Sequence, residues 1–170
     1  MKSFIILSLF FSFLFSFDKV TTFNSDFIQT INNPTGQKIE YNGTIYINGN
    51  SKIAWFYKTP MSKEIYILDS EVTIIEPDLE QVIVTKHNVQ LDLFAILSQA
   101  LEKKKNFSHK IDKQTFDIEV DKNGKIKTIN YLDEFENKVQ ISFNNTLYNN
   151  KIEDKVYEFV IPYNYDIMYK

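Results

Sequence analysis

Cysteine and arginine are absent from this chain of 170 residues, and glycine and proline are scarce, at four each. A chain without cysteine has no disulfides, so its stability must come from a hydrophobic core. The missing cysteine also excludes a lipid anchor held by a thioether at the N-terminus. All 19 basic residues are lysine, and the net charge is −3. Such a mildly acidic chain is a poor partner for nucleic acid, which attracts basic surfaces.

The chain also lacks the motifs that accompany catalysis or metal binding. It contains no Gly-x-Ser-x-Gly elbow, phosphate-binding loop, His-Glu-x-x-His motif or EF-hand loop. The two histidines, His87 and His109, have no second ligand at metal-site spacing. Paired carboxylates such as Glu119 and Asp121 lie beside predicted turns, where solvated carboxylates are usual. The sequence therefore predicts no enzyme, no cofactor and no metal centre.

The first 17 residues have the features of a secretory signal. Lys2 supplies a positive start, and residues 4–15 are Phe, Ile and Leu with scattered Ser. That apolar run is shorter than the roughly 20 residues that a transmembrane helix needs. We expect a signal peptide over residues 1–17, cut after Ser16 or Phe17, and one mature domain over residues 18–170. An uncleaved N-terminal anchor is the alternative.

Hydrophobic periodicity predicts a mainly β protein with two helices. The apolar residues between Asp18 and Ile31 recur at helical spacing, which predicts an amphipathic N-terminal helix. From Lys38 the period changes to two, and turn signals recur about every ten residues, as in an antiparallel meander. Gly43 within the first strand predicts a bulge or a bend, which a curved sheet needs. The strands are expected at residues 38–47, 53–57, 64–68, 71–75, 81–86, 108–112, 115–120, 125–132, 138–143 and 155–161.

A second helix interrupts this meander. Its apolar residues form the strongest helical stripe in the chain, and Asp92 is placed to cap its N-terminus. Because a sheet of about ten strands tends to curl, a helix between its strands must pack on one face or plug an open end. This helix is either an ordinary core helix or a lid whose inner face meets a ligand.

Short motifs follow one another in a distinctive order along nearly the whole mature chain. They are Val20-x-x-Phe23, Phe27-x-Gln29, Gly43-Thr44-Ile45-Tyr46-Ile47, Trp55-x-Tyr57-x-x-Pro60, Pro77-Asp78-Leu79-Glu80-Gln81-Val82, Leu93-Phe94-Ala95-Ile96-Leu97 and Phe159-x-Ile161-Pro162. Each motif is weak alone. In this order and at this spacing they resemble those of the periplasmic outer-membrane lipoprotein carrier family, LolA.

The resemblance implies an unclosed antiparallel half-barrel with a helical lid over an apolar cavity. It also implies a monomeric periplasmic carrier that uses no ATP itself. Such a carrier accepts triacylated lipoproteins from an inner-membrane ABC transporter and passes them to an outer-membrane acceptor. From strand parity and the lid stripe, we expect acyl chains to contact Ile45, Ile47, Trp55, Tyr57, Ile65, Ile67, Ile74, Leu93, Ile96 and Leu97. For the strand residues, ordinary core packing is the alternative.

Two further readings of the chain compete with the carrier. A sensor domain of similar half-barrel fold detects lipoproteins or lipids, but such proteins usually continue into a second domain. A lipid-active hydrolase would need a nucleophile motif. The chain also departs from the family pattern, because Asn48-Gly49-Asn50 stands where the family has an arginine that helps to fasten the lid. We hypothesise that the lid is held more weakly here, or that Lys52 replaces the arginine.

Overall fold

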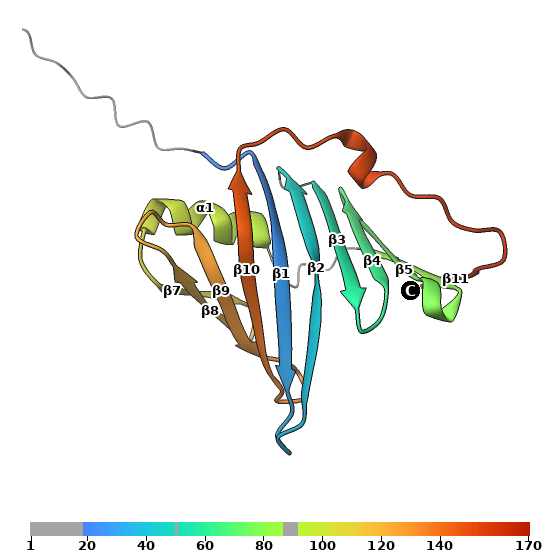
Figure 1. The fold of residues 1–170 in the computed structure, drawn as a ribbon, viewed down its shortest axis with the longest axis horizontal. Coiled ribbons are helices and arrows are strands. Elements are labelled where there is room, and N and C mark those ends of the chain that lie inside the picture. The colour runs from blue at the N-terminus through green and yellow to red at the C-terminus, as the bar shows by residue number, and fades with distance from the viewer. Residues whose placement is uncertain (1–18, 50, 87–91) are drawn as a thin grey trace, which may run out of the picture.

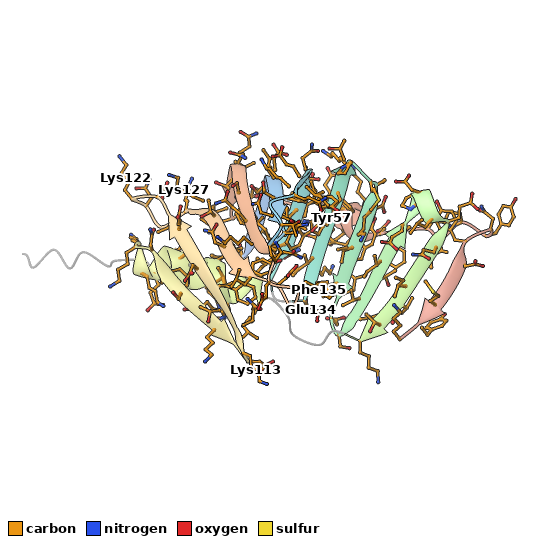
Figure 2. The ribbon with its side chains drawn as sticks, turned by 90° about the horizontal axis from the view of Figure 1, so that it is seen from below. Tyr57, Lys113, Lys122, Lys127, Glu134 and Phe135 are labelled. Atoms are coloured by element: carbon orange, nitrogen blue, oxygen red, sulfur yellow. The ribbon has the colours of Figure 1, made fainter. Side chains whose placement is uncertain are left out.

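The protein is a single curved sheet with one α-helix on its inner face, as a computed structural model describes it for residues 19–49, 51–86 and 92–170. The predicted signal peptide and His87 lie outside the described residues. Figure 1 shows the sheet from its face and Figure 2 from one end, where its strands form an arch. The strand order is β11-β6-β5-β4-β3-β2-β1-β10-β9-β8-β7. All neighbours pair antiparallel except β11, which runs parallel to β6.

The strands are β1 (Thr22–Asn32), β2 (Lys38–Asn48), β3 (Lys52–Thr59), β4 (Lys63–Leu68), β5 (Glu71–Glu76), β6 (Gln81–Lys86), β7 (Phe107–Ile111), β8 (Gln114–Val120), β9 (Ile126–Leu132), β10 (Lys138–Tyr148) and β11 (Asp166–Tyr169). The described helices are α1 (Leu93–Lys103) and two short 3-10 helices, η1 (Pro77–Leu79) and η2 (Asp154–Tyr157). The strands predicted between residues 38 and 143 are confirmed, and so is the unclosed half-barrel.

The sheet separates two hydrophobic cores. The larger core lies on the concave face, where Phe23 and Phe27 of β1 pack with Ile141 of β10 and with Leu97 of α1. The smaller core lies on the convex face of β3 to β6, where Ala54, Tyr66 and Val82 pack with Tyr157 of the C-terminal segment. The helix therefore covers the sheet from inside the arch, and the C-terminal segment covers it from outside.

The predicted N-terminal helix is wrong, because residues 22–32 form the central strand β1. Phe23, Ser25 and Phe27 alternate inward and are 1, 2 and 1% exposed. The apolar residues of this segment recur at spacings that fit both a helix and a strand. The polar Ser25 interrupts the alternation of apolar residues that would have indicated a strand. Ser25 is buried at no loss because its hydroxyl donates to the carbonyl oxygen of Asn144, 2.7 Å away. Pairing on both sides, with β2 and β10, then favours the strand.

The last predicted strand, residues 155–161, is also wrong. Residues 154–157 form η2, and the chain that follows packs on the convex face rather than pairing with a strand. The apolar residues Tyr157, Phe159 and Ile161 alternate as a strand would, which explains the error. Their side chains lie against the sheet, with the Phe159 ring 4.6 Å from that of Tyr66. The strand that does close the chain is β11, along the edge of β6.

The bulge expected at Gly43 is confirmed, since the pairing of β2 with β3 shifts register between Asn42 and Gly43. A side chain has no room there. A Cβ at Gly43 would lie 1.8 Å from the carbonyl oxygen of Phe56 and 2.9 Å from the Phe27 ring. Glycine therefore allows β3 and the buried Phe27 ring to approach β2 where the sheet bends.

Replacing Gly43 by alanine should lower the free energy of unfolding by about 3 kcal/mol, because β3 or the Phe27 ring must move away from the new methyl group. Urea unfolding followed by circular dichroism measures this loss. Lys58→Ala, at an exposed position of β3, is the matched control and should change stability by less than about 0.5 kcal/mol. Equal stability of the two variants would show that the close approach at Gly43 is not required.

Candidate functional site

The helix α1 is fixed at both ends and buried along one stripe. Its N-cap is the predicted one, since a carboxylate oxygen of Asp92 accepts the Ala95 N–H at 2.9 Å. The residues of its inner face are almost inaccessible, at 0 to 3% exposed, and are Leu93, Ile96, Leu97 and Ala100. The three predicted lid residues therefore pack into the concave core, as the helical stripe indicated.

One half of the arch holds the C-terminal part of α1. Gln99 Nε2 lies 3.0 Å from His109 Nδ1 on β7, and the Lys103 ammonium lies 4.4 Å from the Phe107 ring. The turn between β8 and β9 also touches the helix, because a Cβ at Gly124 would lie 2.6 Å from the Ala100 carbonyl oxygen. These contacts place α1 toward β7, β8 and β9, on the left of the sheet in Figure 1.

Cross-strand pairing brings the strand residues of the predicted cavity into two neighbouring rows on the concave face. The first row runs from β2 to β6 and consists of Ile45, Trp55, Ile65, Ile74 and Ile83, each paired with the next. The second row consists of Ile47, Ile53, Ile67 and Val72. Tyr57 follows Trp55 on the same face of β3, because alternate residues of a strand point the same way.

Burial decreases along these rows away from α1. Ile45 and Ile47 are fully buried in the concave core, and the half-buried Trp55, Tyr57 and Ile67 pack against its margin. Farther out, four half-buried side chains pack in neither core, namely Ile65, Val72, Ile74 and Ile83. We use the term apolar floor for Trp55, Ile65, Ile67, Val72, Ile74 and Ile83.

Val72 and Ile83 belong to the apolar floor but were not among the predicted contact residues. Val72 and Ile74 are two residues apart on β5 and therefore point to the same face, so the alternation in the sequence alone could have identified Val72. Ile83 is different, because only the register of β6 against β5 shows that it lies opposite Ile74. The sequence gives the strand but not this register, since η1 and Glu80 intervene between the two strands.

A row of polar side chains, which we call the polar row, borders the apolar floor on one side. It consists of Tyr57, Lys63, Glu76 and Gln81, the next paired positions along β3 to β6. Lys63 Nζ lies 2.8 Å from Glu76 Oε1, and Gln81 Nε2 donates to Glu76 Oε2. The Tyr57 hydroxyl donates to Gln29 Oε1 at 2.7 Å.

A pocket of about 210 Å³ lies where the polar row meets the apolar floor, lined by Gln29, Ile31, Tyr41, Tyr57, Met61, Lys63 and Ile65. A larger hollow of about 730 Å³ lies over the ends of β8, β9 and β10, where Lys113, Asp117 and Glu136 are among its lining residues. The larger hollow shares no residue with the apolar floor, so the smaller pocket marks the candidate site.

Electrostatics stabilise the charged form of Glu76. The hydrogen bond from Lys63 lowers the pKa of the Glu76 carboxyl; burial opposes this shift, and the hydrogen bond from Gln81 adds to it. Burial raises the pKa of the Tyr57 hydroxyl, which stays neutral at physiological pH. The polar row therefore presents one neutral phenol and one closed ion pair.

Over residues 19–49, 51–86 and 92–170, no helix is both long and apolar enough to cross a bilayer. The same residues hold no group of three or more His, Cys, Asp or Glu placed to bind a metal ion. The hydrogen-bonding partner of His109 is Gln99. What these residues do assemble on the concave face is an apolar surface with a polar border.

The model of the family described as "Outer membrane lipoprotein carrier protein LolA" matches residues 18–160. This chain belongs to the LolA family. Two curated relatives are both named outer-membrane lipoprotein carrier protein. One, from Campylobacter jejuni, is 38% identical over 169 residues and covers 98% of each chain. The other, from Wolinella succinogenes, is 34% identical over 148 residues and covers 86% of each. The family name describes a carrier and not an enzyme.

A solved structure supports the fold of this LolA-family chain. An uncharacterized conserved protein from Thermus thermophilus superposes with a TM-score of 0.54 over 89% of this chain and 91% of its own. The two sequences are only 11% identical, so the likeness concerns the fold alone.

Lys63→Met should lower the free energy of unfolding at neutral pH. The difference from the wild-type protein should become smaller in acid. The folded-state pKa of Glu76 is lowered from 4.5, so the ion pair stabilises the fold above that value. This contribution disappears as the pH falls through the lowered pKa and Glu76 takes up a proton. Urea unfolding of both proteins at pH 7 and pH 3 measures the difference.

The control for this experiment is Lys38→Met, which removes the exposed pair between Lys38 and Glu40. Exposed pairs contribute little to stability. We expect Lys38→Met to have the same free energy of unfolding as the wild-type protein at both pH values. A Lys63→Met deficit of the same size at pH 7 and pH 3 would contradict the stabilising role of the ion pair.

Proposed function

We propose that this protein is a periplasmic carrier that binds the acyl chains of lipoproteins on its apolar floor and moves lipoproteins from the inner to the outer membrane. The observation that carries the proposal is the half-buried apolar floor on the concave face, four of whose six side chains pack in neither core, in a chain of the LolA family. Hydrocarbon chains fit such a surface because they offer apolar area and require no specific polar partners along their length.

Reversible binding is explained if the acyl chains extend from the floor onto the part of the concave face that α1 covers and displace the helix. Burying one CH₂ group contributes about 0.8 kcal/mol, so a chain of about 14 such groups could gain ~11 kcal/mol. A carrier that kept this whole gain could not release its cargo. On α1, Leu93, Ile96 and Leu97 occupy the rest of the concave face. When cargo displaces them, their lost burial offsets part of the gain and keeps binding reversible.

The remaining parts of the proposal come from the sequence and the family. Residues 1–17 direct export, and the mature domain, residues 18–170, acts in the periplasm as a monomer. It receives triacylated lipoproteins from an inner-membrane ABC transporter and passes them to an outer-membrane acceptor. The alternative of a sensor domain is not favoured, because a relative that spans 98% of this chain is named as a carrier.

Depleting this protein from its own cells should leave outer-membrane lipoproteins in the inner membrane, because acyl chains cannot cross the aqueous periplasm unshielded. Fractionation of the two membranes followed by immunoblotting of lipoproteins measures their distribution. Unchanged sorting would overturn the carrier function.

Complementation of the depleted cells links this function to the apolar floor. Ile74→Glu places a carboxylate where acyl chains would have to desolvate it, so this variant should fail to restore sorting at wild-type protein levels. The matched control is Ile28→Glu, since Ile28 is 39% exposed on the opposite face of the sheet, and it should restore sorting. Restoration by both variants would show that the floor does not hold the cargo.

A further inference from the structure

Trp55, the only tryptophan of the chain, has a buried indole N–H without a hydrogen-bond acceptor among the described residues. An unpaired buried donor costs free energy, and native proteins retain few such groups. The same side chain is only half-buried as a whole and forms part of the apolar floor. The unused donor therefore lies just beneath the surface that faces the cargo, and a ligand reaches it only when the side chains around the indole move.

The surroundings of Trp55 explain why the donor stays unpaired. Its ring stacks on Tyr57 at 6.0 Å between ring centroids and meets the edge of Phe27 at 5.4 Å. Its cross-strand partners are Ile45 and Ile65. Phenylalanine and isoleucine side chains carry no acceptor oxygen, and the backbone groups of the paired strands bond to one another. The Tyr57 hydroxyl is bonded to Gln29 and not to the indole.

A polar border lies next to Trp55 on the concave face. Residues two apart on a strand are separated by about 6.7 Å, so Trp55 lies one row from the polar row. The pocket of about 210 Å³ is lined by the two neighbours of Trp55, Tyr57 and Ile65, and by Lys63. A lipid whose hydrocarbon lies on Ile65 and Ile74 and whose head lies at the polar row would bring its first carbonyl group to Trp55.

We propose that the indole N–H of Trp55 donates a hydrogen bond to an acyl carbonyl oxygen of the bound lipid, an inference that rests on the proposed carrier function. The carbonyl at the head of each chain is the acceptor that an acyl group has and an alkyl group lacks. Trp55 is then a specificity-determining residue, which makes the floor prefer acylated lipids over ether-linked lipids of equal chain length.

The experiment follows the indole N–H directly by NMR, because one tryptophan gives one indole cross-peak in a ¹H–¹⁵N spectrum of the purified protein. The probes are a synthetic triacylated lipopeptide and a counterpart with two ether-linked chains and one N-alkyl chain of the same lengths, which has three chains and no acyl carbonyl. Co-elution in gel filtration measures binding independently. We expect the triacylated probe to bind about tenfold more tightly, and only this probe to shift the indole proton downfield.

Each outcome decides a different point. Equal affinity for both probes, with the same indole shift, would overturn the role of Trp55 while leaving the carrier function intact. Binding of neither probe would overturn the carrier function and this inference together. A third probe, with ether-linked chains and an N-acyl group, distinguishes the two sources of the carbonyl. A downfield shift with this probe identifies the amide, and its absence identifies an ester.

Trp55→Phe tests the same inference by affinity, since it keeps a flat apolar ring and removes the donor. We expect this variant to bind the two lipids within about twofold of each other, whereas the convex-face control Ile28→Glu should keep the tenfold preference. A tenfold preference retained in Trp55→Phe would assign the discrimination to another group. If Trp55→Phe does not fold, the indole shift of the wild-type protein still decides the question.

Discussion

The concave face of the sheet is wider than the helix that covers it, and the rest of the structure depends on this mismatch. Ten spacings between eleven strands give a sheet of roughly 48 Å, whereas an eleven-residue helix is about 16 Å long. The helix α1 therefore buries one part of the apolar face and leaves another part half-buried. The second part is the apolar floor, and apolar patches left open on a protein surface commonly mark binding sites.

The two halves of the arch are held by different means. Toward β7, β8 and β9, the helix packs from inside and forms the larger core. Toward β4, β5 and β6, the C-terminal segment packs from outside, where Tyr66 meets Phe159 and Lys52 Nζ lies 3.2 Å from Asp154. The β-strands under the apolar floor are thus supported on their convex side. Their concave side, which α1 leaves half-buried, can take up a lipid without losing that support.

The position of Lys52 also bears on how the lid is held. Its contact with Asp154 lies on the convex face, whereas α1 lies on the concave face. In this structure Lys52 therefore contacts the C-terminal segment and not α1. At the turn where that arginine would stand, the Gly49 N–H donates to the Thr21 carbonyl oxygen at 2.8 Å and ties β2 to the start of β1. Asn50 of the same turn lies outside the described residues.

The elements that the sequence predicted correctly are those with a single clear period. The stripe and N-cap of α1 and the strands between residues 38 and 143 are of this kind. Residues 22–32 were mistaken for a helix because their apolar residues satisfy two periods, and only the partners β2 and β10 decide between them. The candidate site was predicted in part for a similar reason. The alternation of side chains along each strand predicts that Ile65 and Ile74 lie on one face. Only the register of β6 against β5 shows that Ile83 lies beside them.

The central claim is that the lipid and α1 compete for one concave face. Hydrogen exchange of the backbone amides, with and without a bound triacylated lipopeptide, tests it most directly. The competition predicts faster exchange over residues 93–103 when lipid is bound, because the helix leaves its site, while exchange in β1 and β10 stays unchanged. Exchange of the helix that is equal or slower with lipid bound would contradict the claim and would make α1 a permanent part of the core.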